Sequence, residues 1–282
     1  MNLAALGLAA TAGAMALGAG ALAGLWSDEA SETAPANDTR GFVNAAAIVD
    51  PGGSDESRIY RITIPGLQSD KPSPDPPLWE WPASAEGLRL WSNGDSTSYF
   101  MTVALLSLLE AQGGIPMHEP DYVISSGLMN PGYFDWPAFL AAEMGRADPD
   151  IVVFMLGAND AVGQPDLEVY RSRVAEVMDL LRRPGRFVIW VGQPTIDAAV
   201  RPALAAYVPL LNRVFAEEAA KREWVRYVDA QTATAGADGA FAKFLPDETG
   251  QVRSMRADDG VHLSSAGGRL IALEVVEVLF AR

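Results

Sequence analysis

The stretch Ile151-Val152-Val153-Phe154-Met155-Leu156-Gly157-Ala158-Asn159-Asp160 decides the fold that this sequence predicts. Its first six residues are apolar without a break, which is typical of a strand buried on both faces of a parallel sheet. The next four bring a glycine, an amide and a carboxylate to the end of that strand. Ligands of open α/β sheets bind beyond the carboxyl ends of the strands, so this segment also indicates where a site would lie.

Apolar runs and helical patterns alternate on both sides of this stretch. Besides residues 151–156, strands are predicted at residues 88–91, 122–125, 187–191 and 225–228. Helices are predicted at residues 97–111, 136–144, 167–181, 202–222 and 264–280, the first with an apolar face of Phe100, Val103, Ala104, Ser107 and Leu108. Five strands that alternate with helices predict a doubly wound α/β fold.

The composition excludes several classes of function. The 282 residues carry a formal net charge of -15, and the only lysines are Lys71, Lys221 and Lys243. A nucleic-acid partner is therefore not expected, because a phosphate-binding surface needs clustered basic residues. Without cysteine the chain has no disulfide, thiolate metal site or Cys nucleophile, and its two histidines make a His-rich metal site improbable.

The N-terminal part of the chain differs in composition from the rest. Residues 1–26 carry no charged side chain, and they predict a signal peptide or a membrane anchor, with both alternatives open. Residues 27–57 are polar and predict a flexible linker. Residues 58–87, with a strand-like start at 58–64, predict an extension that packs on a main domain at 88–282. We therefore expect an exported protein, periplasmic or tethered to the inner membrane.

Polar segments follow the predicted strands. Ser96 comes after the first strand at the start of a helix, where it can be a nucleophile or only a helix cap. Gly127 follows the second strand and would let a backbone N–H approach a ligand closely. Asn159 adds an amide donor at the same edge. The neighbouring Asp95 and Asp160 are predicted to be structural hydrogen-bonding partners.

A fourth polar segment, Asp-Gly-Val-His at residues 259–262, precedes the last helix. An Asp three residues before a His can hold the Nδ1–H of the ring while Nε2 faces a nucleophile. The spacing selects Asp259, and not the adjacent Asp258, as the partner of His262. The only other histidine, His118, lies in a predicted surface connection.

In this order, at the ends of strands, these segments resemble the SGNH (GDSL-type) hydrolase family, named for the Ser, Gly, Asn and His of its four blocks. Ser96, Gly127, Asn159 and His262 match the four named residues, and the resemblance spans residues 88–282. It implies a flavodoxin-like three-layer α/β/α sandwich with a five-stranded parallel sheet. With the apolar N-terminus, the chain looks like the envelope-localised bacterial branch of the family.

The resemblance also implies a Ser-His-Asp triad. Ser96 would attack an ester carbonyl, His262 would accept and later return the proton, and Asp259 would orient the imidazole. The backbone N–H groups of Ser96 and Gly127, with the Asn159 side chain, would form the oxyanion hole. None of these steps requires a metal or an organic cofactor.

Three further residues are predicted to contact substrate. Tyr133 is one of three aromatic residues after Gly127, and the other two can equally be core residues at the start of the next helix. Gln193 follows the fourth strand. Arg256 lies in a long irregular stretch, 232–258, and could bind a carboxylate such as that of a succinyl group, or pair with a nearby acidic side chain.

The function predicted first is a serine esterase that removes small O-acyl groups, most plausibly from an envelope glycan. An O-acyltransferase on the same scaffold is the alternative, because an acyl-serine can be captured by a sugar hydroxyl as well as by water. Such a transferase could work with a membrane acyltransferase partner. An inactive glycan-binding module is the third hypothesis, from another class, and a lipase is disfavoured by the acidic composition.

Overall fold

The computed structural model describes residues 79–281. The predictions for residues 1–57 and for the strand at 58–64 lie outside this part of the chain. Within it, no helix is both long enough and apolar enough to cross a membrane.

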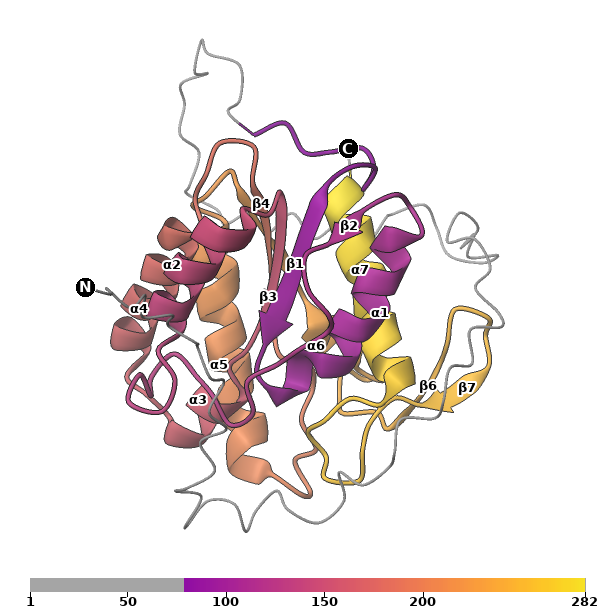
Figure 1. Cartoon of the computed structure of the whole chain (residues 1–282). Coiled ribbons are helices and arrows are strands. Elements are labelled where there is room, and N and C mark those ends of the chain that lie inside the picture. Colours follow the sequence, from indigo (N-terminus) through magenta and orange to yellow (C-terminus); the bar gives the residue numbers. More distant parts are fainter. Residues whose placement is uncertain (1–78, 282) are drawn as a thin grey trace, which may run out of the picture. The chain divides into compact units, whose positions relative to one another are not determined.

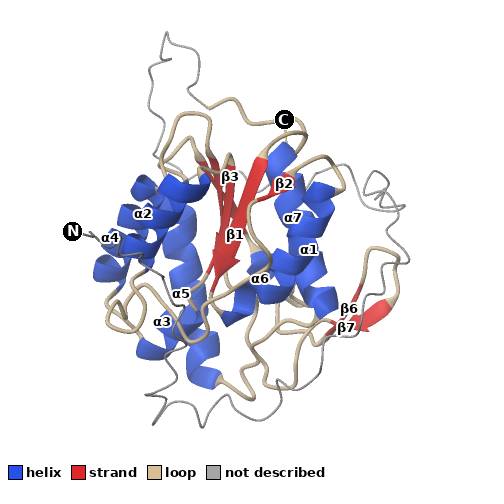
Figure 2. Ribbon diagram, viewed as in Figure 1, coloured by secondary structure: helices blue, strands red, loops and turns tan. Residues whose placement is uncertain are grey.

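A five-stranded sheet forms the centre of the described part (Figures 1 and 2). Its strands are β1 (Arg89–Gly94), β2 (Ile115–Pro116), β3 (Ile151–Met155), β4 (Phe187–Val191) and β5 (Val225–Val228). They lie in the order β2-β1-β3-β4-β5, and every neighbouring pair is parallel. The predicted doubly wound parallel sheet is thus confirmed.

Helices cover both faces of the sheet (Figure 1). One face carries α1 (Tyr99–Glu110) and α7 (Ser265–Phe280), and the other carries α2 (Trp136–Ala147), α4 (Leu167–Leu180) and α5 (Pro202–Ala219). Alternate residues of β3 point to opposite layers: Val153 belongs to the core under α1 and α7, whereas the Phe154 ring packs 4.9 Å from that of Trp136 in α2. The sheet is therefore buried on both sides, which explains the unbroken apolar runs of β3 and β4.

The smaller elements lie in the connections. They are η2 (Ser96–Ser98), α3 (Ala158–Gly163), α6 (Ala230–Ala233) and the antiparallel hairpin of β6 (Phe244–Pro246) and β7 (Val252–Ser254). The stretch predicted as irregular, 232–258, thus contains this hairpin.

The prediction for the second strand is wrong. Residues 122–125 form a turn with Ser125 at φ 56°, and only the N–H of Val123 bonds back to β1, at Gly94 O. The strand is β2, where Ile115 and Pro116 pair with Arg89 and Leu90. Strand β2 lies at the edge of the sheet, and the N–H groups of Ile115 and Met117 donate to Leu88 O and Leu90 O of the neighbouring segment. The missing N–H of Pro116 therefore faces away from β1, and the chain continues as a loop after Met117.

The apolar face predicted for the first helix is also wrong in part. Phe100 and Val103 are exposed, whereas Met101, Leu105 and Leu109 are buried. Helix α1 packs against both α7 and the sheet, so residues around most of its circumference are apolar. When apolar residues lie on most sides of a helix, their spacing in the sequence does not show which side faces the core.

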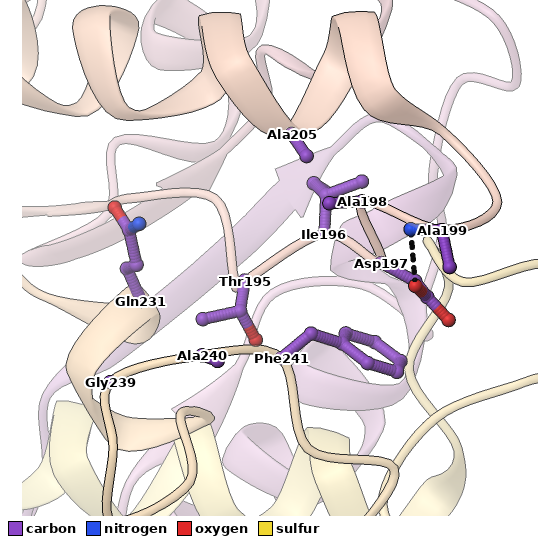
Figure 3. Close-up of a pocket in the computed structure, with 10 residues that line it drawn as sticks. All are labelled: Thr195, Ile196, Asp197, Ala198, Ala199, Ala205, Gln231, Gly239, Ala240 and Phe241. Carbon is purple, nitrogen blue, oxygen red and sulfur yellow. Dashed lines mark hydrogen bonds between the residues drawn. The ribbon is translucent and has the colours of Figure 1, made fainter.

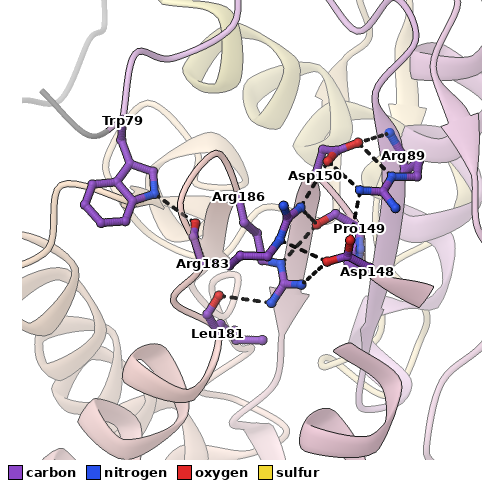
Figure 4. Close-up of polar contacts among 8 residues, drawn as sticks. All are labelled: Trp79, Arg89, Asp148, Pro149, Asp150, Leu181, Arg183 and Arg186. Carbon is purple, nitrogen blue, oxygen red and sulfur yellow. Dashed lines mark hydrogen bonds and ion pairs between the residues drawn. The ribbon is translucent and has the colours of Figure 1, made fainter. Parts of the chain in front are cut away.

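The amino ends of the strands are tied together by charged side chains (Figure 4). The Asp150 carboxylate accepts hydrogen bonds from the backbone and side chain of Arg89 and from Arg183. Asp148 pairs with Arg186 from the turn before β4. The indole N–H of Trp79 donates to the backbone oxygen of Arg183, which attaches the first described residues to this end of the sheet.

Candidate active site

Ser96 lies at the carboxyl edge of the sheet, directly after β1, as the first residue of the short helix η2. The Asp95 carboxylate before it accepts hydrogen bonds from the N–H of Thr97 at 2.9 Å and of Gly157 at 3.0 Å. Asp95 thus joins the end of β1 to the end of β3. Its predicted structural role is confirmed, and burial raises the pKa of its carboxyl group although these hydrogen bonds oppose the shift.

His262 and Asp259 meet Ser96 from the loop that precedes α7. The hydroxyl of Ser96 lies 2.9 Å from Nε2 of His262, and Nδ1 of the same ring lies 2.5 Å from Oδ2 of Asp259. The other oxygen of Asp259 accepts the N–H groups of Val261 and His262. This turn holds the side chains of Asp259 and His262 in hydrogen-bonding contact with each other. Through His262 they form one hydrogen-bonded chain with Ser96, which is 166 positions away in the sequence.

The charge state of Asp259 suits this arrangement. Burial would raise the pKa of its carboxyl group, but the hydrogen bonds from the ring and N–H of His262 and from the N–H of Val261 outweigh burial, so the pKa lies well below its usual value. The side chain is therefore ionised at neutral pH. Asp258, the alternative, is exposed and pairs with Lys243 instead.

The three hydrogen-bond donors predicted for the oxyanion hole have capacity to donate. Within residues 79–281, the backbone N–H groups of Ser96 and Gly127 have no hydrogen-bond acceptor. The Asn159 amide donates one hydrogen to Ser126 O at 2.9 Å, and an amide nitrogen carries a second. Free backbone donors beside a serine are what an oxyanion hole consists of.

The loop that carries Gly127 is held by a second carboxylate. Asp160 accepts the N–H groups of Leu128 at 3.0 Å and Met129 at 2.9 Å, together with the Tyr170 hydroxyl. A Cβ at Gly127 would collide with this carboxylate, so the close approach requires glycine. Burial raises the pKa of Asp160 to about 6, although its hydrogen bonds act in the opposite direction. The predicted structural role of Asp160 is confirmed.

Comparison with known proteins places the chain in a family. A family model described as "Protein of unknown function (DUF459)" matches residues 89–278. The chain belongs to this family. No curated protein sequence matches it.

Solved structures share the fold of this DUF459 member. A catalytic variant of Axe2, an acetylxylan esterase from Geobacillus stearothermophilus, is 17% identical with a TM-score of 0.52 over 70% of this chain and 96% of that one. A second variant, described as an acetyl-xylooligosaccharide esterase, is 16% identical with a TM-score of 0.50 over 71% and 97%. A lipase/acylhydrolase from Enterococcus faecalis is 17% identical with a TM-score of 0.47 over 69% and 96%. The two Axe2 variants show that the chain shares their α/β fold.

Gln193 does not occupy the place that the sequence predicts for a substrate contact. Its side chain is fully buried, and Oε1 lies 3.0 Å from the Thr97 hydroxyl. Its backbone N–H and carbonyl both bond to the Asn212 amide in α5. Gln193 supports the turn that presents Ser96, and the assignment to substrate binding is corrected.

Arg256 is also corrected, because its guanidinium group lies inside the protein. It donates to the carbonyl oxygens of Val261 at 2.6 Å and His262 at 3.4 Å, and to the Thr195 hydroxyl at 3.3 Å. Burial lowers its pKa to about 10, against the opposing effect of nearby carboxylates. A buried group that holds carbonyl oxygens is not available to bind a substrate carboxylate. Arg253 is exposed and pairs with Asp247.

Tyr133 is the one predicted substrate contact that the structure leaves exposed. Its ring is 55% exposed, and its hydroxyl donates to Ile124 O within the same loop. The next aromatic residues contribute to the core: Trp136 is fully buried, and its ring packs 4.9 Å from that of Phe134.

Two residues that hold the segments of the candidate site in place were not identified from the sequence. The missed residues are Thr97 and Ser126. The Thr97 hydroxyl donates to Asp95, and Ser126 accepts from the Asn159 amide and from the Trp136 indole. The only signal for them in the sequence is that each adjoins a residue of the four blocks or ends a strand.

Proposed function

We propose that this chain is a serine esterase in which Ser96 is the nucleophile, His262 the general base and acid, and Asp259 the residue that orients the imidazole. The observation that carries the proposal is the continuous hydrogen-bonded chain from Ser96 Oγ through His262 to Asp259, at 2.9 and 2.5 Å. Further support is that the backbone N–H groups of Ser96 and Gly127 have no acceptor within residues 79–281 and are thus available to an oxyanion.

The geometry suits acyl transfer through a covalent intermediate. His262 accepts the Ser96 proton as the oxygen attacks the ester carbonyl, and the ionised Asp259 stabilises the imidazolium that forms. The N–H groups of Ser96 and Gly127 and the second hydrogen of the Asn159 amide stabilise the tetrahedral oxyanion. His262 then returns the proton to the leaving alcohol, and water releases the acyl group from Ser96 by the same steps in reverse order.

The proposed substrate is a small O-acyl ester on a glycan of the bacterial cell envelope. Support for the sugar comes from the shared fold of an acetylxylan esterase, and support for the location comes from the uncharged, apolar residues 1–26. Fractionation of cells that make the full chain tests the location. We expect the protein in the envelope fraction.

Hydrolysis of p-nitrophenyl acetate by the full chain tests the chemistry. Ser96→Ala and His262→Ala should each lower kcat by about 10⁴-fold or more, because each removes a reacting group. Two variants are matched controls. His118→Ala removes the other histidine, and Asp258→Asn removes the carboxylate next to Asp259. Both should keep the wild-type rate. A Ser96→Ala protein that retains full activity would refute the proposal.

An added soluble oligosaccharide separates hydrolysis from transfer. Free acetate as the product indicates the esterase, whereas acylated oligosaccharide would identify the O-acyltransferase that the sequence leaves as the alternative.

A further inference from the structure

A second hollow borders the candidate active site. It has a cavity volume of about 380 Å³ and is formed by the loop after β4, the start of α6 and residues 239–241 (Figure 3). Its polar and aromatic side chains are those of Thr195, Asp197, Gln231 and Phe241, and the other lining residues are Ile196, one glycine and four alanines. A volume in this range is that of a small-molecule site.

The hollow is joined directly to the loop that carries Asp259 and His262. The N–H of Asp197 donates to Gly260 O at 2.9 Å, and the two residues touch so closely that a Cβ at Gly260 would meet the Asp197 side chain at 2.7 Å. Strand β4 lies between β3, which leads to Asn159, and β5. The hollow thus adjoins the turn between Asp259 and His262, at the carboxyl edge of the sheet.

The lining suits a polyhydroxylated ring. The half-buried Phe241 offers an aromatic face, on which the C–H groups of a sugar can pack. Asp197 accepts the Ala199 N–H with Oδ1, while Oδ2 has no hydrogen bond within the described residues. The Gln231 amide accepts from Asn212 through Oε1, which leaves its Nε2 hydrogens as donors. Acceptor, donor and aromatic face thus surround one space.

The charges around the hollow disfavour an ionic ligand. Behind it the Arg256 guanidinium lies 5.0 Å from the centre of the Phe241 ring and 3.3 Å from the Thr195 hydroxyl. Its positive charge interacts with the Asp197 carboxylate. Arg256 interacts with the Asp259 carboxylate as well. Because its guanidinium group already lies against the Phe241 ring, a second cation on that ring would be repelled, so a neutral ligand fits better than a quaternary ammonium group.

We propose that this pocket binds a neutral sugar ring of the alcohol part of the ester, next to the acyl group that reacts at Ser96. The proposal rests on the proposed esterase function and adds to it the class and the position of the alcohol. Phe241 supplies the aromatic face, Asp197 accepts hydroxyl hydrogens and Gln231 donates to hydroxyl oxygens.

The test compares three acetate esters with the full chain: acetylated xylobiose, acetylcholine and p-nitrophenyl acetate. The measured quantity is the ratio of kcat/KM for acetylated xylobiose to kcat/KM for p-nitrophenyl acetate. Phe241→Leu keeps the volume but removes the aromatic face, and Asp197→Asn and Gln231→Ala each remove a polar contact. We expect each to lower this ratio by about 2-fold to 10-fold through KM. Phe241→Tyr should keep the ratio.

Phe244→Leu is the matched control, because Phe244 is an exposed phenylalanine outside the pocket and should leave the ratio unchanged. A ratio that the three pocket variants leave unchanged would overturn the inference. So would a wild-type preference for acetylcholine that Asp197→Asn abolishes, since it would identify a cation site. Ser96-dependent hydrolysis of p-nitrophenyl acetate is measured in the same proteins, so failure of the esterase proposal is distinguishable from failure of the pocket.

Discussion

Arg256 places a positive charge inside the protein, against the backbone that carries His262. Its guanidinium group binds the carbonyl oxygens of Val261 and His262, and within residues 79–281 it forms no ion pair with a carboxylate. A buried cation is costly, and here its hydrogen bonds go to the segment that must place an imidazole 2.9 Å from a serine. We therefore infer that Arg256 is a positioning residue.

Arg256→Met should lower kcat for p-nitrophenyl acetate by about 10-fold to 100-fold, because a 1 Å displacement of a reacting group can cost this much. The Val261 carbonyl left without a donor costs about 1 to 3 kcal/mol of stability, whereas the His262 carbonyl keeps the N–H of Ala257. Arg256→Lys keeps the charge and one donor and should restore part of kcat. The control is Arg253→Met, which removes an exposed arginine of β7. Unchanged kcat with a lower melting temperature would show that Arg256 serves stability alone.

The elements show which features the sequence could predict. The strands β3 and β4 are continuous apolar runs, whereas β1 and β5 also contain arginine or polar residues. Polar or glycine-containing segments follow all four, so periodicity and turn chemistry located them and the blocks after them. Strand β2 has only two residues and is defined by pairing with β1, which no local pattern reveals. Gly127 still reaches the carboxyl edge, because Asp160 holds the two N–H groups after it. Gln193 was misjudged because its burial depends on α5, which is distant in sequence.

Asp160 makes the loop after Gly127 sensitive to pH. Its pKa in the folded chain, about 6, lies above the ordinary value of 3.8, so the folded state binds more protons than the unfolded state between these values. The contribution of this group to the unfolding free energy therefore falls as pH rises through that window. Relative to Asp160→Asn, the wild type should lose about 3 kcal/mol between pH 4 and pH 7.

Urea denaturation of both proteins at several pH values measures this difference. Asp121→Asn is the matched control, since it removes an exposed carboxylate from the same loop. A difference between wild type and Asp160→Asn that does not depend on pH would show that the Asp160 carboxyl group titrates alike in the folded and unfolded states.

On the scale of the described domain, stability and chemistry lie at opposite edges of the sheet. The carboxyl edge holds Ser96, His262 and the hollow at Phe241, and its buried polar groups bind the segments that carry Ser96 and His262. The amino edge holds the pairs of Arg89 and Asp150 and the packing of two tryptophans. Trp79 lies 5.1 Å from Trp224, which precedes β5, and Trp81 lies 5.0 Å from Phe187, which begins β4. The first described residues are therefore attached at the edge that lacks the candidate site.

This separation predicts that the contacts of Trp79 with the amino edge can be removed without loss of esterase activity. Trp79 is only 6% exposed, and Trp79→Ala removes the ring contact with Trp224 and the bond to Arg183 O. We expect a loss of about 3 kcal/mol and a melting temperature lower by roughly 6 to 12 °C. Because Ser96 stands at the other edge, kcat/KM of the folded protein at 25 °C should equal that of the wild type. Trp79→Phe keeps a ring and should lose less stability. If instead Trp79→Ala lowered kcat/KM while the protein stayed folded, the two edges would be coupled through the strands, and the placement of Ser96 would depend on packing at the far end of β1.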